Sequence, residues 1–547
     1  MAKKLFIVSS VVLGLAIVAP TPEARADASA ELEQAETLAK NGQYEQAEGI
    51  YQQILTDYGG TDFAFQAQRG LTILYIATDN QPQADAAFEQ LIANYSNHPD
   101  FSDAVCVIGD NFRWRGIDGK ARDMYQIAVA GICPSEAIWP QMGLAITSIR
   151  LKHYETADAL TEQILSDFVG DDRLSQAACL IADAYRSTRH HKQGMDLYQY
   201  VIDNHPDSEY AMWSQMGIAI CNIDLRNNDA AESAIAKLVS DYAEHPSFYQ
   251  AVRDIADNYR WRDVHDKAHE MYELAAEGVG RSEAFWPKMG LAITSVQLGD
   301  YETAESLTEQ LLTQFANHDQ LPEAICLIGG SYRGVSEYDK ALNLYQTILE
   351  VWPASEQALW TKAGMAGIDI ARGDQAAAAK AIDNLIADFN DHPVLPQAIL
   401  AIGQEYYAQA LRKEKAGLVA EARGCFTKAI AVWERIIAEL PPSDPSTPRA
   451  YRLSALCYRR LGQHEKAIEY YQNIVDDWPD HDYAARAQCM VARTYRYLKR
   501  TGVTAESEAD PKIKAAYERL LRDYPEAAAS ARNWLNYYNQ VHQGGHK

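Results

Sequence analysis

The sequence of 547 residues lacks the motifs that most catalytic, metal-binding and nucleotide-binding sites require. It contains no HExxH, no pair of CxxC motifs, no GxSxG and no glycine-rich phosphate loop. Histidines and cysteines do not gather at metal-ligand spacing, and acidic pairs are so frequent that no single pair indicates acid–base chemistry. We therefore expect a protein that is not an enzyme and that needs no metal and no cofactor.

Long hydrophobic runs are also scarce, because only residues 5–19 form one. This run is too short to span a bilayer, which needs about 20 residues. Two lysines precede it, and two prolines and the small-residue segment 24–26 follow it, a pattern typical of a secretory signal peptide. The sequence predicts a signal peptide over residues 1–26 that is cleaved after Ala26, or alternatively after Ala28. An exported, periplasmic protein is expected.

Positive charge is in short supply. The chain carries 50 lysines and arginines against 75 aspartates and glutamates, which gives a net charge of −25. The negative electrostatic potential of such an acidic protein disfavours nucleic acid and anionic membrane surfaces as partners. No cysteine follows the small residues of the signal segment, and no later segment is apolar enough to span a membrane. We expect no nucleic-acid partner, no membrane span and no lipid anchor.

What the sequence does contain is repetition. The segment SEAIWPQMGLAITS at residues 135–148 returns as SEAFWPKMGLAITS at residues 282–295, and residues 113–174 match residues 260–321 without a gap. The two copies are 147 residues apart, and half of that distance also separates equivalent residues, so the repeating unit has 73–74 residues. Such periods are typical of solenoids, in which each unit buries its apolar face by stacking on a neighbour.

Each unit divides into two helical hairpins, of which residues 451–479 (YRLSALCYRRLGQHEKAIEYYQNIVDDWP) are the clearest. Apolar and small residues, including Tyr458 and Tyr471, recur there at three- and four-residue spacing, which predicts two amphipathic helices. Gly462 supplies the turn between them, and Pro479 ends the second helix. The repeating element is therefore a pair of antiparallel helices.

This hairpin resembles the tetratricopeptide repeat family. The residues at its signature positions are Ala455, Tyr458, Gly462, Ala467, Tyr471 and Pro479. Similar hairpins follow one another along almost the whole chain after Ala26, about thirteen in all. The resemblance implies an all-α fold, a right-handed superhelical solenoid of double-hairpin units, in which the first helix of each hairpin lines a concave groove.

A narrower resemblance lies in segments such as NHPDSEYAMWSQ, VWPASEQALWTK and DDWPDHDYAARAQCMVARTY. They are similar to tetratricopeptide proteins of the bacterial cell envelope, such as the β-barrel assembly lipoprotein and the Tol–Pal coordination protein. This resemblance implies a periplasmic scaffold that binds other proteins. The chain departs from those proteins in its longer array, and from the first of them in lacking a lipid-bearing cysteine.

The chain after the signal peptide divides into three parts that differ in how regularly the hairpins repeat. Residues 27–393 form the regular array, and residues 394–450 form an irregular repeat with a lengthened helix and the proline-rich connection 441–448. Residues 451–547 form a C-terminal array with a polar insertion at 499–511. The insertions mark either a binding face or tolerated surface loops.

The eight cysteines do not predict disulfides. Cys106, Cys179 and Cys326 stand at equivalent points of successive units. Equivalent points of a solenoid lie much further apart than the ~7 Å between Cα atoms that a disulfide allows. We expect these thiols to fill small apolar sites.

Two series of side chains alternate between the hairpins. In one hairpin of each pair, an arginine stands eight residues before the small residue of the second helix. These residues are Arg113, Arg186, Arg260, Arg333 and Arg459, and the first four, which we call the Arg ladder, are the candidates for binding. In the other hairpin a tryptophan stands near the start of the first helix. These residues, the Trp ladder, are Trp139, Trp213, Trp286 and Trp360.

Both ladders lie on first helices, which the family resemblance places along the groove. Arginine binds carboxylates through two parallel hydrogen bonds, and tryptophan offers a flat apolar face to a peptide side chain or a sugar ring. Packing within the solenoid is the competing interpretation of both ladders. Trp114 and Trp261, each between two arginines, are the best candidates for exposed aromatic residues. The candidate partner-binding residues are Arg113, Trp114, Arg115, Arg186, Arg260, Trp261, Arg262, Arg333, Trp139, Trp213, Trp286 and Trp360.

The sequence thus predicts a non-enzymatic exported scaffold that binds protein partners of the cell envelope through its groove. The alternative is a binder of an anionic or extended polysaccharide along the two ladders. A remote alternative is a helical accessory of an enzyme that processes peptidoglycan or another glycan. Binding of a glycan should weaken steeply with salt, whereas a protein partner should co-purify at fixed stoichiometry.

Overall fold

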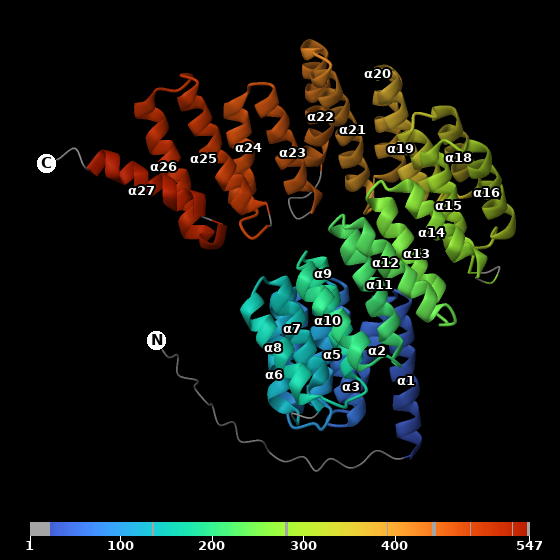
Figure 1. Cartoon of the computed structure of the whole chain (residues 1–547). Helices are drawn as coiled ribbons and strands as arrows, with labels where there is room; N and C mark the ends of the chain where they lie inside the picture. The colour runs from blue at the N-terminus through green and yellow to red at the C-terminus, as the bar shows by residue number, and fades with distance from the viewer. Residues whose placement is uncertain are drawn as a thin grey trace. The chain divides into compact units, whose positions relative to one another are not determined.

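The computed structural model describes residues 22–133, 136–278, 280, 283–390, 392–439, 445–481, 483–527 and 529–543. Within these ranges the chain forms 27 α-helices, one short 3₁₀ helix and no strand, so the predicted all-α fold is confirmed (Figure 1). The helices divide into two compact units, Met1–Arg262 and Asp263–Lys547. No helix of the described residues is long and apolar enough to cross a bilayer.

The first unit contains thirteen of the described helices. They are α1 (Pro22–Lys40), α2 (Tyr44–Asp57), α3 (Asp62–Ala77), α4 (Gln81–Tyr95), α5 (Phe101–Trp114), α6 (Asp118–Gly131), α7 (Ile138–Arg150), α8 (Tyr154–Asp167), α9 (Leu174–Ser187), α10 (His191–Asn204), α11 (Glu209–Asp224), α12 (Asn228–Tyr242) and α13 (Phe248–Trp261). Residues 1–21 of the expected signal peptide lie outside the described residues. Helix α1 runs through the expected cleavage site, and Ala28, Leu32 and Ala35 beyond it are buried.

The second unit contains the remaining described helices. They are α14 (His265–Glu277), α15 (Phe285–Leu298), α16 (Tyr301–Gln314), α17 (Leu321–Gly334), α18 (Tyr338–Val351), α19 (Glu356–Arg372), α20 (Gln375–Phe389), α21 (Leu395–Lys415), α22 (Val419–Glu439), α23 (Ser446–Arg460), α24 (His464–Asp477), α25 (Ala484–Arg500), α26 (Glu506–Asp523), the 3₁₀ helix η2 (Pro525–Ala527) and α27 (Ala529–Gln543). Helices α21 and α22 have 21 residues each, against 14 in α17 and α18.

The turn inside each hairpin uses one residue with a left-handed backbone, with φ between 58° and 82°. These residues are Gly42, Asp79, Gly116, Lys152, Arg189, Arg226, Asp263, Gly299, Ser336, Gly373, Gly417, Gly462 and Gly502. The next amide closes the turn, as where Asn80 N donates to Tyr75 O at 2.9 Å. This is the Schellman end of a helix, and it satisfies carbonyl groups that the helix leaves unpaired.

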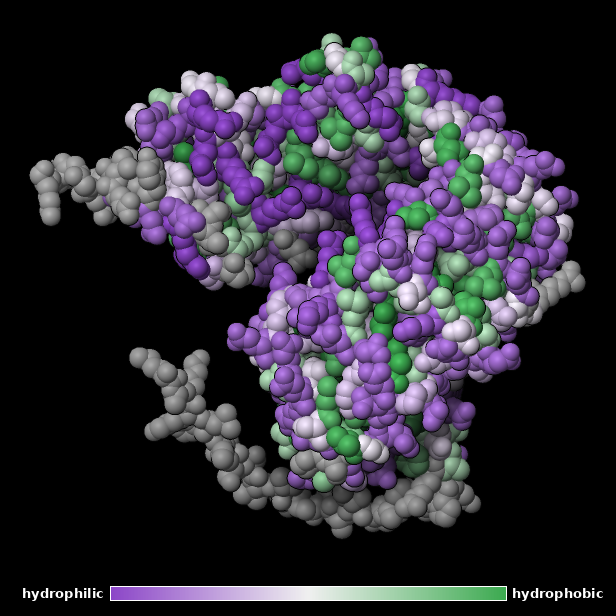
Figure 2. Space-filling model, in the orientation of Figure 1, coloured by the Kyte–Doolittle hydropathy of each residue, from purple (hydrophilic) through white to green (hydrophobic). Residues whose placement is uncertain are grey.

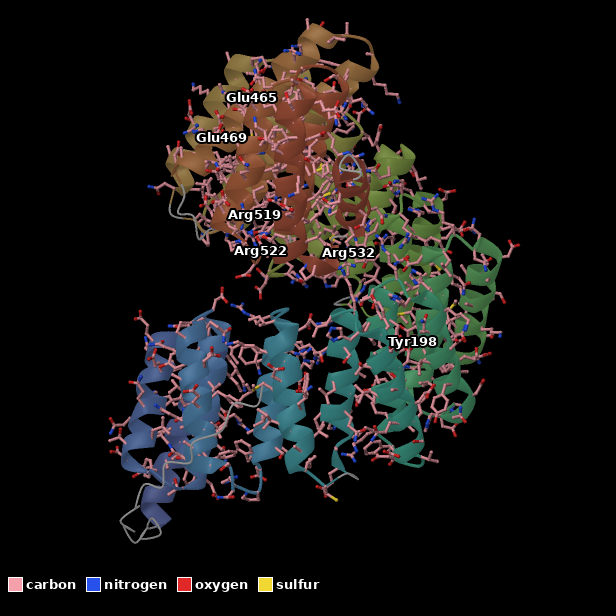
Figure 3. All side chains as sticks on the ribbon, turned by 90° about the vertical axis from the view of Figure 1, so that its left-hand side faces the viewer. Tyr198, Glu465, Glu469, Arg519, Arg522 and Arg532 are labelled. Carbon is pink, nitrogen blue, oxygen red and sulfur yellow. The ribbon has the colours of Figure 1, made fainter. Side chains whose placement is uncertain are left out.

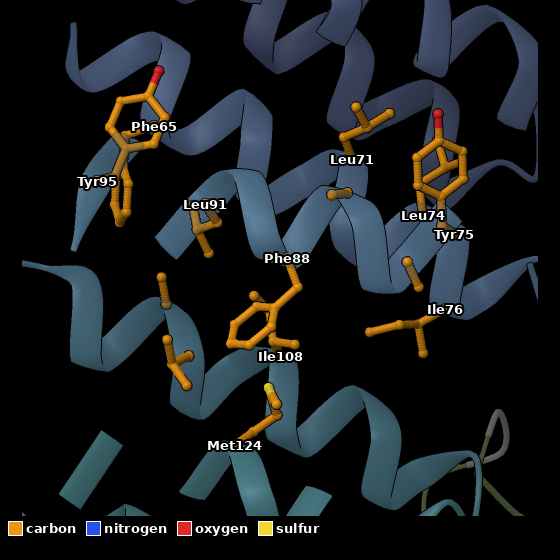
Figure 4. Packing of buried hydrophobic residues seen from close by; sticks show 14 of the residues in the cluster. Phe65, Leu71, Leu74, Tyr75, Ile76, Phe88, Leu91, Tyr95, Ile108 and Met124 are labelled. Carbon is orange, nitrogen blue, oxygen red and sulfur yellow. The ribbon is translucent and has the colours of Figure 1, made fainter. Parts of the chain in front are cut away.

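Apolar side chains from successive helices form a core that continues along the array. In the first unit Phe65, Phe88, Ile108 and Met124 come from α3, α4, α5 and α6 and belong to one buried cluster (Figure 4). Cys106 and Cys179 are buried in such clusters, as expected for thiols that fill apolar sites, and burial raises the pKa of the Cys106 thiol to about 12. Cys326 is only half-buried and accepts a hydrogen bond from Thr361.

A repeated contact joins each double unit across hairpins. A tyrosine of a second helix packs on a glycine of the following first helix, as Tyr198 does on Gly217. A methyl group on Gly217 would lie 2.4 Å from the Tyr198 ring, so only glycine fits there. We call this the tyrosine–glycine contact. It joins Tyr51 to Gly70, Tyr125 to Gly143, Tyr198 to Gly217, Tyr272 to Gly290 and Tyr345 to Gly364.

The first helices of the hairpins, which carry odd numbers, form a layer of their own. In the first unit α3, α5, α7, α9 and α11 each pack on the next odd-numbered helix, and in the second unit α15, α17, α19 and α21 do so. Within each unit, the even-numbered helices α2 to α12 and α16 to α26 each pack on the odd-numbered helix that precedes them in sequence. One face of each unit is therefore lined by first helices, which is where the sequence analysis placed both ladders.

Candidate functional site

The Arg ladder is bonded within its own hairpins. At the end of α5, Arg113 Nε donates to Tyr125 Oη at 3.0 Å, and Arg113 Nη2 donates to Asp110 Oδ1 at 2.9 Å. Tyr125 Oη donates to the same carboxylate oxygen at 2.7 Å. We call this arrangement the Arg–Asp–Tyr triad. It ties the first helix of the hairpin to the second, and only 15% of the Arg113 side chain remains exposed.

The triad recurs in the next double unit. Arg186 donates to Tyr198 Oη at 3.2 Å and to Asp183 Oδ1 at 3.0 Å, and Tyr198, labelled in Figure 3, donates to Asp183 at 2.6 Å. Burial raises the pKa of the Tyr198 phenol far above its usual value, and the Asp183 carboxylate raises it further, so the phenol stays protonated. In α13, Arg260 donates to Asp257 Oδ1 at 3.0 Å. Intrachain carboxylates thus neutralise these arginines.

The fourth arginine of the ladder is paired differently. Gly330 stands three residues before Arg333, where the other ladder arginines have an aspartate. Arg333 Nη1 instead binds Glu405 of α21, two hairpins further along the chain. Burial alone would lower the pKa of Arg333, but the Glu405 carboxylate raises it above its usual value. The ion pair leaves open the position beside Gly330 that an aspartate would fill.

That position adjoins a hollow of about 380 Å³ lined by residues of α17, α18, α19 and α21. Its walls include the apolar side chains of Leu327, Trp360 and Ala401 together with the Arg333–Glu405 pair. The structure therefore brings together one member of each ladder, Arg333 and Trp360. A hollow with apolar walls and a few oriented polar groups is the usual form of a binding pocket.

The Trp ladder lies half in the core. All four tryptophans are half-buried, and each packs against a cluster of buried residues. Trp286 packs edge-on against Phe285, and Trp360 Nε1 donates to Glu356 Oε1 at 3.2 Å. Their inner faces support the hairpins, and their outer edges remain on the surface of the first helices.

The remaining candidates lie at helix ends. Trp114 and Trp261 are each 71% exposed, as expected from their positions between arginines. Arg262 pairs with Asp224 of α11, whereas Arg115 is exposed. None of these four residues lines the hollow beside Arg333.

Sequence reasoning found the arginines but missed their partners. The aspartate three residues before Arg113, Arg186 and Arg260 and the tyrosine twelve residues after each could have been found by extending the same alignment. The glycines that receive those tyrosines also repeat with the array, in the segments MGLAITS and MGIAICN. A helical glycine that recurs with the repeat indicates close packing of another helix.

Comparisons with known proteins find the same repeat. Tetratricopeptide repeat families match residues 29–61 and 446–502, and no curated protein matches the chain. Solved structures with a similar fold include a tetratricopeptide repeat protein from Parabacteroides merdae, with 16% identity, 56% of this chain and 98% of the other covered and a TM-score of 0.29.

Two other solved structures are pilF from Pseudomonas aeruginosa and yeast Tom70. The first has 16% identity over 41% of this chain and 96% of the other, with a TM-score of 0.28. The second has 13% identity over 90% of this chain and 99% of the other, with a TM-score of 0.34. The family matches support a helical repeat scaffold of the tetratricopeptide type, whose usual role is to bind other proteins.

Proposed function

We propose that this tetratricopeptide-type solenoid is a non-enzymatic, exported scaffold of the bacterial periplasm that binds partner proteins along the face of its first helices. The N-terminal segment 1–26 supports export, and the repeat architecture supports binding rather than catalysis. In the described residues no group of three or more histidine, cysteine or acidic side chains is arranged to hold a metal ion. The proposal gives the regular repetition its role as a long docking surface.

The observation that carries the proposal is the hollow beside Arg333. Its wall contains Leu327, which is 41% exposed although it is apolar, and the outer edge of Trp360. Burying two such side chains under a partner stabilises a complex, at about 25 cal/mol for each Å² removed from water. Arg333 and Glu405 at the edge of the hollow can orient backbone or side-chain polar groups of that partner.

Site-specific photo-crosslinking tests this proposal. A photoreactive residue at Leu327 should capture one defined envelope protein at fixed stoichiometry, and Trp360→Ala should abolish the adduct. A photoreactive residue at the exposed position Gln346 on α18, a second helix, is the matched control and should capture nothing. In the same sample, the intact mass should show a chain that begins after Ala26.

Two outcomes would contradict the proposal. Identical adducts at Leu327 and Gln346 would show that the first-helix face has no preference for a partner. No protein adduct together with salt-sensitive retention on an anionic polysaccharide would favour the glycan alternative. A chain that still begins at Met1 in the cell envelope would contradict export by cleavage.

A further inference from the structure

Charge is distributed unevenly along the chain. Residues 27–393 contain 25 lysines and arginines against 56 aspartates and glutamates, whereas residues 394–547 contain 22 against 18. The contrast is strongest on first helices: α23 and α25 together carry nine arginines and lysines and no carboxylate. Nearby acidic residues include Glu465 and Glu469 on the second helix α24 (Figure 3) and Glu414 on the first helix α21, which pairs with Arg460. The first-helix face is therefore cationic at α23 and α25.

Four arginines on this face form two short rows. Arg452 and Arg459 lie seven residues apart on α23, and Arg486 and Arg493 lie seven apart on α25. A spacing of seven places two side chains on the same side of a helix, two turns apart. Among the described residues none of the four forms an ion pair with a carboxylate, in contrast to Arg113 and its relatives. We call these four residues the arginine rows.

The triad of the regular array is incomplete here. Leu456 stands three residues before Arg459, where Asp110 and Asp183 stand before their arginines. Tyr471, twelve residues after Arg459 and 1% exposed, has a buried hydroxyl that lies beside the Arg459 guanidinium and has no acceptor for its own proton within the described residues. The Nε atom of Arg452 is also buried and unsatisfied. Buried polar atoms without a partner are rare, and they indicate a missing acceptor.

Arginines surround this tyrosine. Burial raises the pKa of the Tyr471 phenol, while Arg459, Arg452 and Arg486 each lower it. The side chain of Arg452 also lies over the ring of Tyr483, 4.5 Å from its centre. Three guanidinium groups near one phenol create a positive field in which a carboxylate is stabilised.

A hollow of about 340 Å³ opens beside the same position. It is lined by Tyr407, Leu456, Arg459, Arg460, His464, Thr494 and Tyr497, and no carboxylate belongs to the lining. Arg460 is paired with Glu414, and the buried Nδ1 atom of His464 has no hydrogen-bond partner in the part of the chain that the structure describes. The walls thus combine cationic and donor groups with apolar and aromatic surface.

We infer that the first-helix face of α23 and α25 binds an acidic polypeptide segment of a partner, and that one aspartate or glutamate of that segment completes the triad of Arg459 and Tyr471. This inference rests on the proposed function and names the chemistry of the partner. The array itself shows which ligand fits, because an aspartate carboxylate occupies the equivalent position beside Arg113 and Arg186. Leu456 and the aromatic wall suit apolar residues between the acidic ones.

Fluorescence anisotropy with a labelled, end-blocked octapeptide of alternating glutamate and leucine tests the inference on the full-length mature protein. The protein should bind this peptide and should not bind its lysine–leucine counterpart. Arg486→Gln combined with Arg493→Gln should weaken binding about tenfold or more, because each substitution removes a charged contact with the peptide. Lys380→Gln on α20, an exposed position, is the matched charge control and should leave affinity unchanged.

A substitution at Leu456 separates loss of the site from loss of folding. Leu456→Asp should supply the missing carboxylate, satisfy Tyr471 and compete with the peptide, so affinity should fall about tenfold while the melting temperature holds or rises. Leu456→Asn, equal in size but without the charge, should retain most of the affinity. Equal affinity in Leu456→Asp and the wild type would overturn the inference, as would binding of an oligogalacturonate but not of the peptide.

Failure here is distinguishable from failure of the proposed function. If Leu327 captures its partner while the acidic peptide fails to bind, the scaffold proposal stands and the inference about α23 and α25 is wrong. If the peptide binds while Leu327 captures nothing, the cationic face is the docking site and the hollow beside Arg333 is not.

Discussion

The regular array and the C-terminal part build the same hairpin around different electrostatics. In the regular array, Arg113 and Arg186 each share an aspartate with a buried tyrosine, so the guanidinium charge is neutralised inside the hairpin. In the C-terminal part, Leu456 replaces that aspartate, and among the described residues no carboxylate pairs with Arg459. The residue three positions before the arginine therefore decides whether a carboxylate of the same hairpin neutralises it.

The same comparison applies to packing. Tyr198 fits against Gly217, nineteen residues later, whereas Met490 stands nineteen residues after Tyr471. The regular array thus locks successive hairpins through a contact that only glycine permits, and the hairpin of α23 and α24 is stacked in another way. The electrostatic and the packing differences thus occur in the same hairpin, that of α23 and α24.

The largest expected effect tests the tyrosine–glycine contact. Gly217→Ala places a methyl group 2.4 Å from the Tyr198 ring, so α10 and α11 must move apart. This should lower the free energy of unfolding by about 1–3 kcal/mol. Hydrogen exchange in α10 and α11 and the thermal midpoint measure this loss. Gly49→Ala in α2, where nothing lies within 4 Å of the added group, is the control and should stabilise by up to about 1 kcal/mol. Equal effects of the two substitutions on stability would show that the tyrosine–glycine contact does not hold successive hairpins together.

A second substitution moves the C-terminal arrangement into the regular array. Asp183→Leu leaves Arg186 and the buried Tyr198 hydroxyl without their acceptor, which should cost about 1–3 kcal/mol. It should also create weak affinity for the glutamate–leucine octapeptide, measured by anisotropy. Asp196→Leu on α10 removes only an exposed pair with Lys192 and should cost less than about 1 kcal/mol. If Asp183→Leu is as stable as Asp196→Leu, the triad is not what joins the helices.

The fold was predicted well from the sequence because the repeated hairpin depends on the spacing of residues that lie close together in the chain. Ala455, Tyr458 and Ala467 recur with the helical period, and every hairpin adds an independent copy of that signal. The thiols of Cys106 and Cys179 were assigned correctly to apolar packing for the same reason. Periodicity does not fix the handedness of the superhelix, which stays a prediction.

The candidate site was predicted less completely, because the roles of its residues depend on contacts between helices. The four ladder arginines look alike in sequence, yet Arg113 binds an aspartate one turn away and Arg333 binds Glu405 two hairpins further along the chain. The alignment shows Gly330 where the other three hairpins have an aspartate, but it cannot show that Glu405 pairs with Arg333 instead. The charge of residues 394–547 was readable from sequence, but the total of −25 concealed it. Whether the ladders bind a partner stays a prediction.

The smallest expected effect concerns the turn that both parts share. Lys152 and Arg226 hold left-handed backbones with φ of 64° and 58°, a conformation that side chains with a Cβ atom disfavour. Lys152→Gly and Arg226→Gly should each stabilise the protein by about 0.5–1 kcal/mol, since glycine adopts this conformation without steric cost. Gly462→Ala, at the equivalent turn between α23 and α24 with φ of 78°, should destabilise by a similar amount. Thermal midpoints measure all three. Opposite effects of the substitutions to glycine and of Gly462→Ala would show that the turn has one geometry in both parts. The difference between the parts would then lie in their side chains rather than in their backbone.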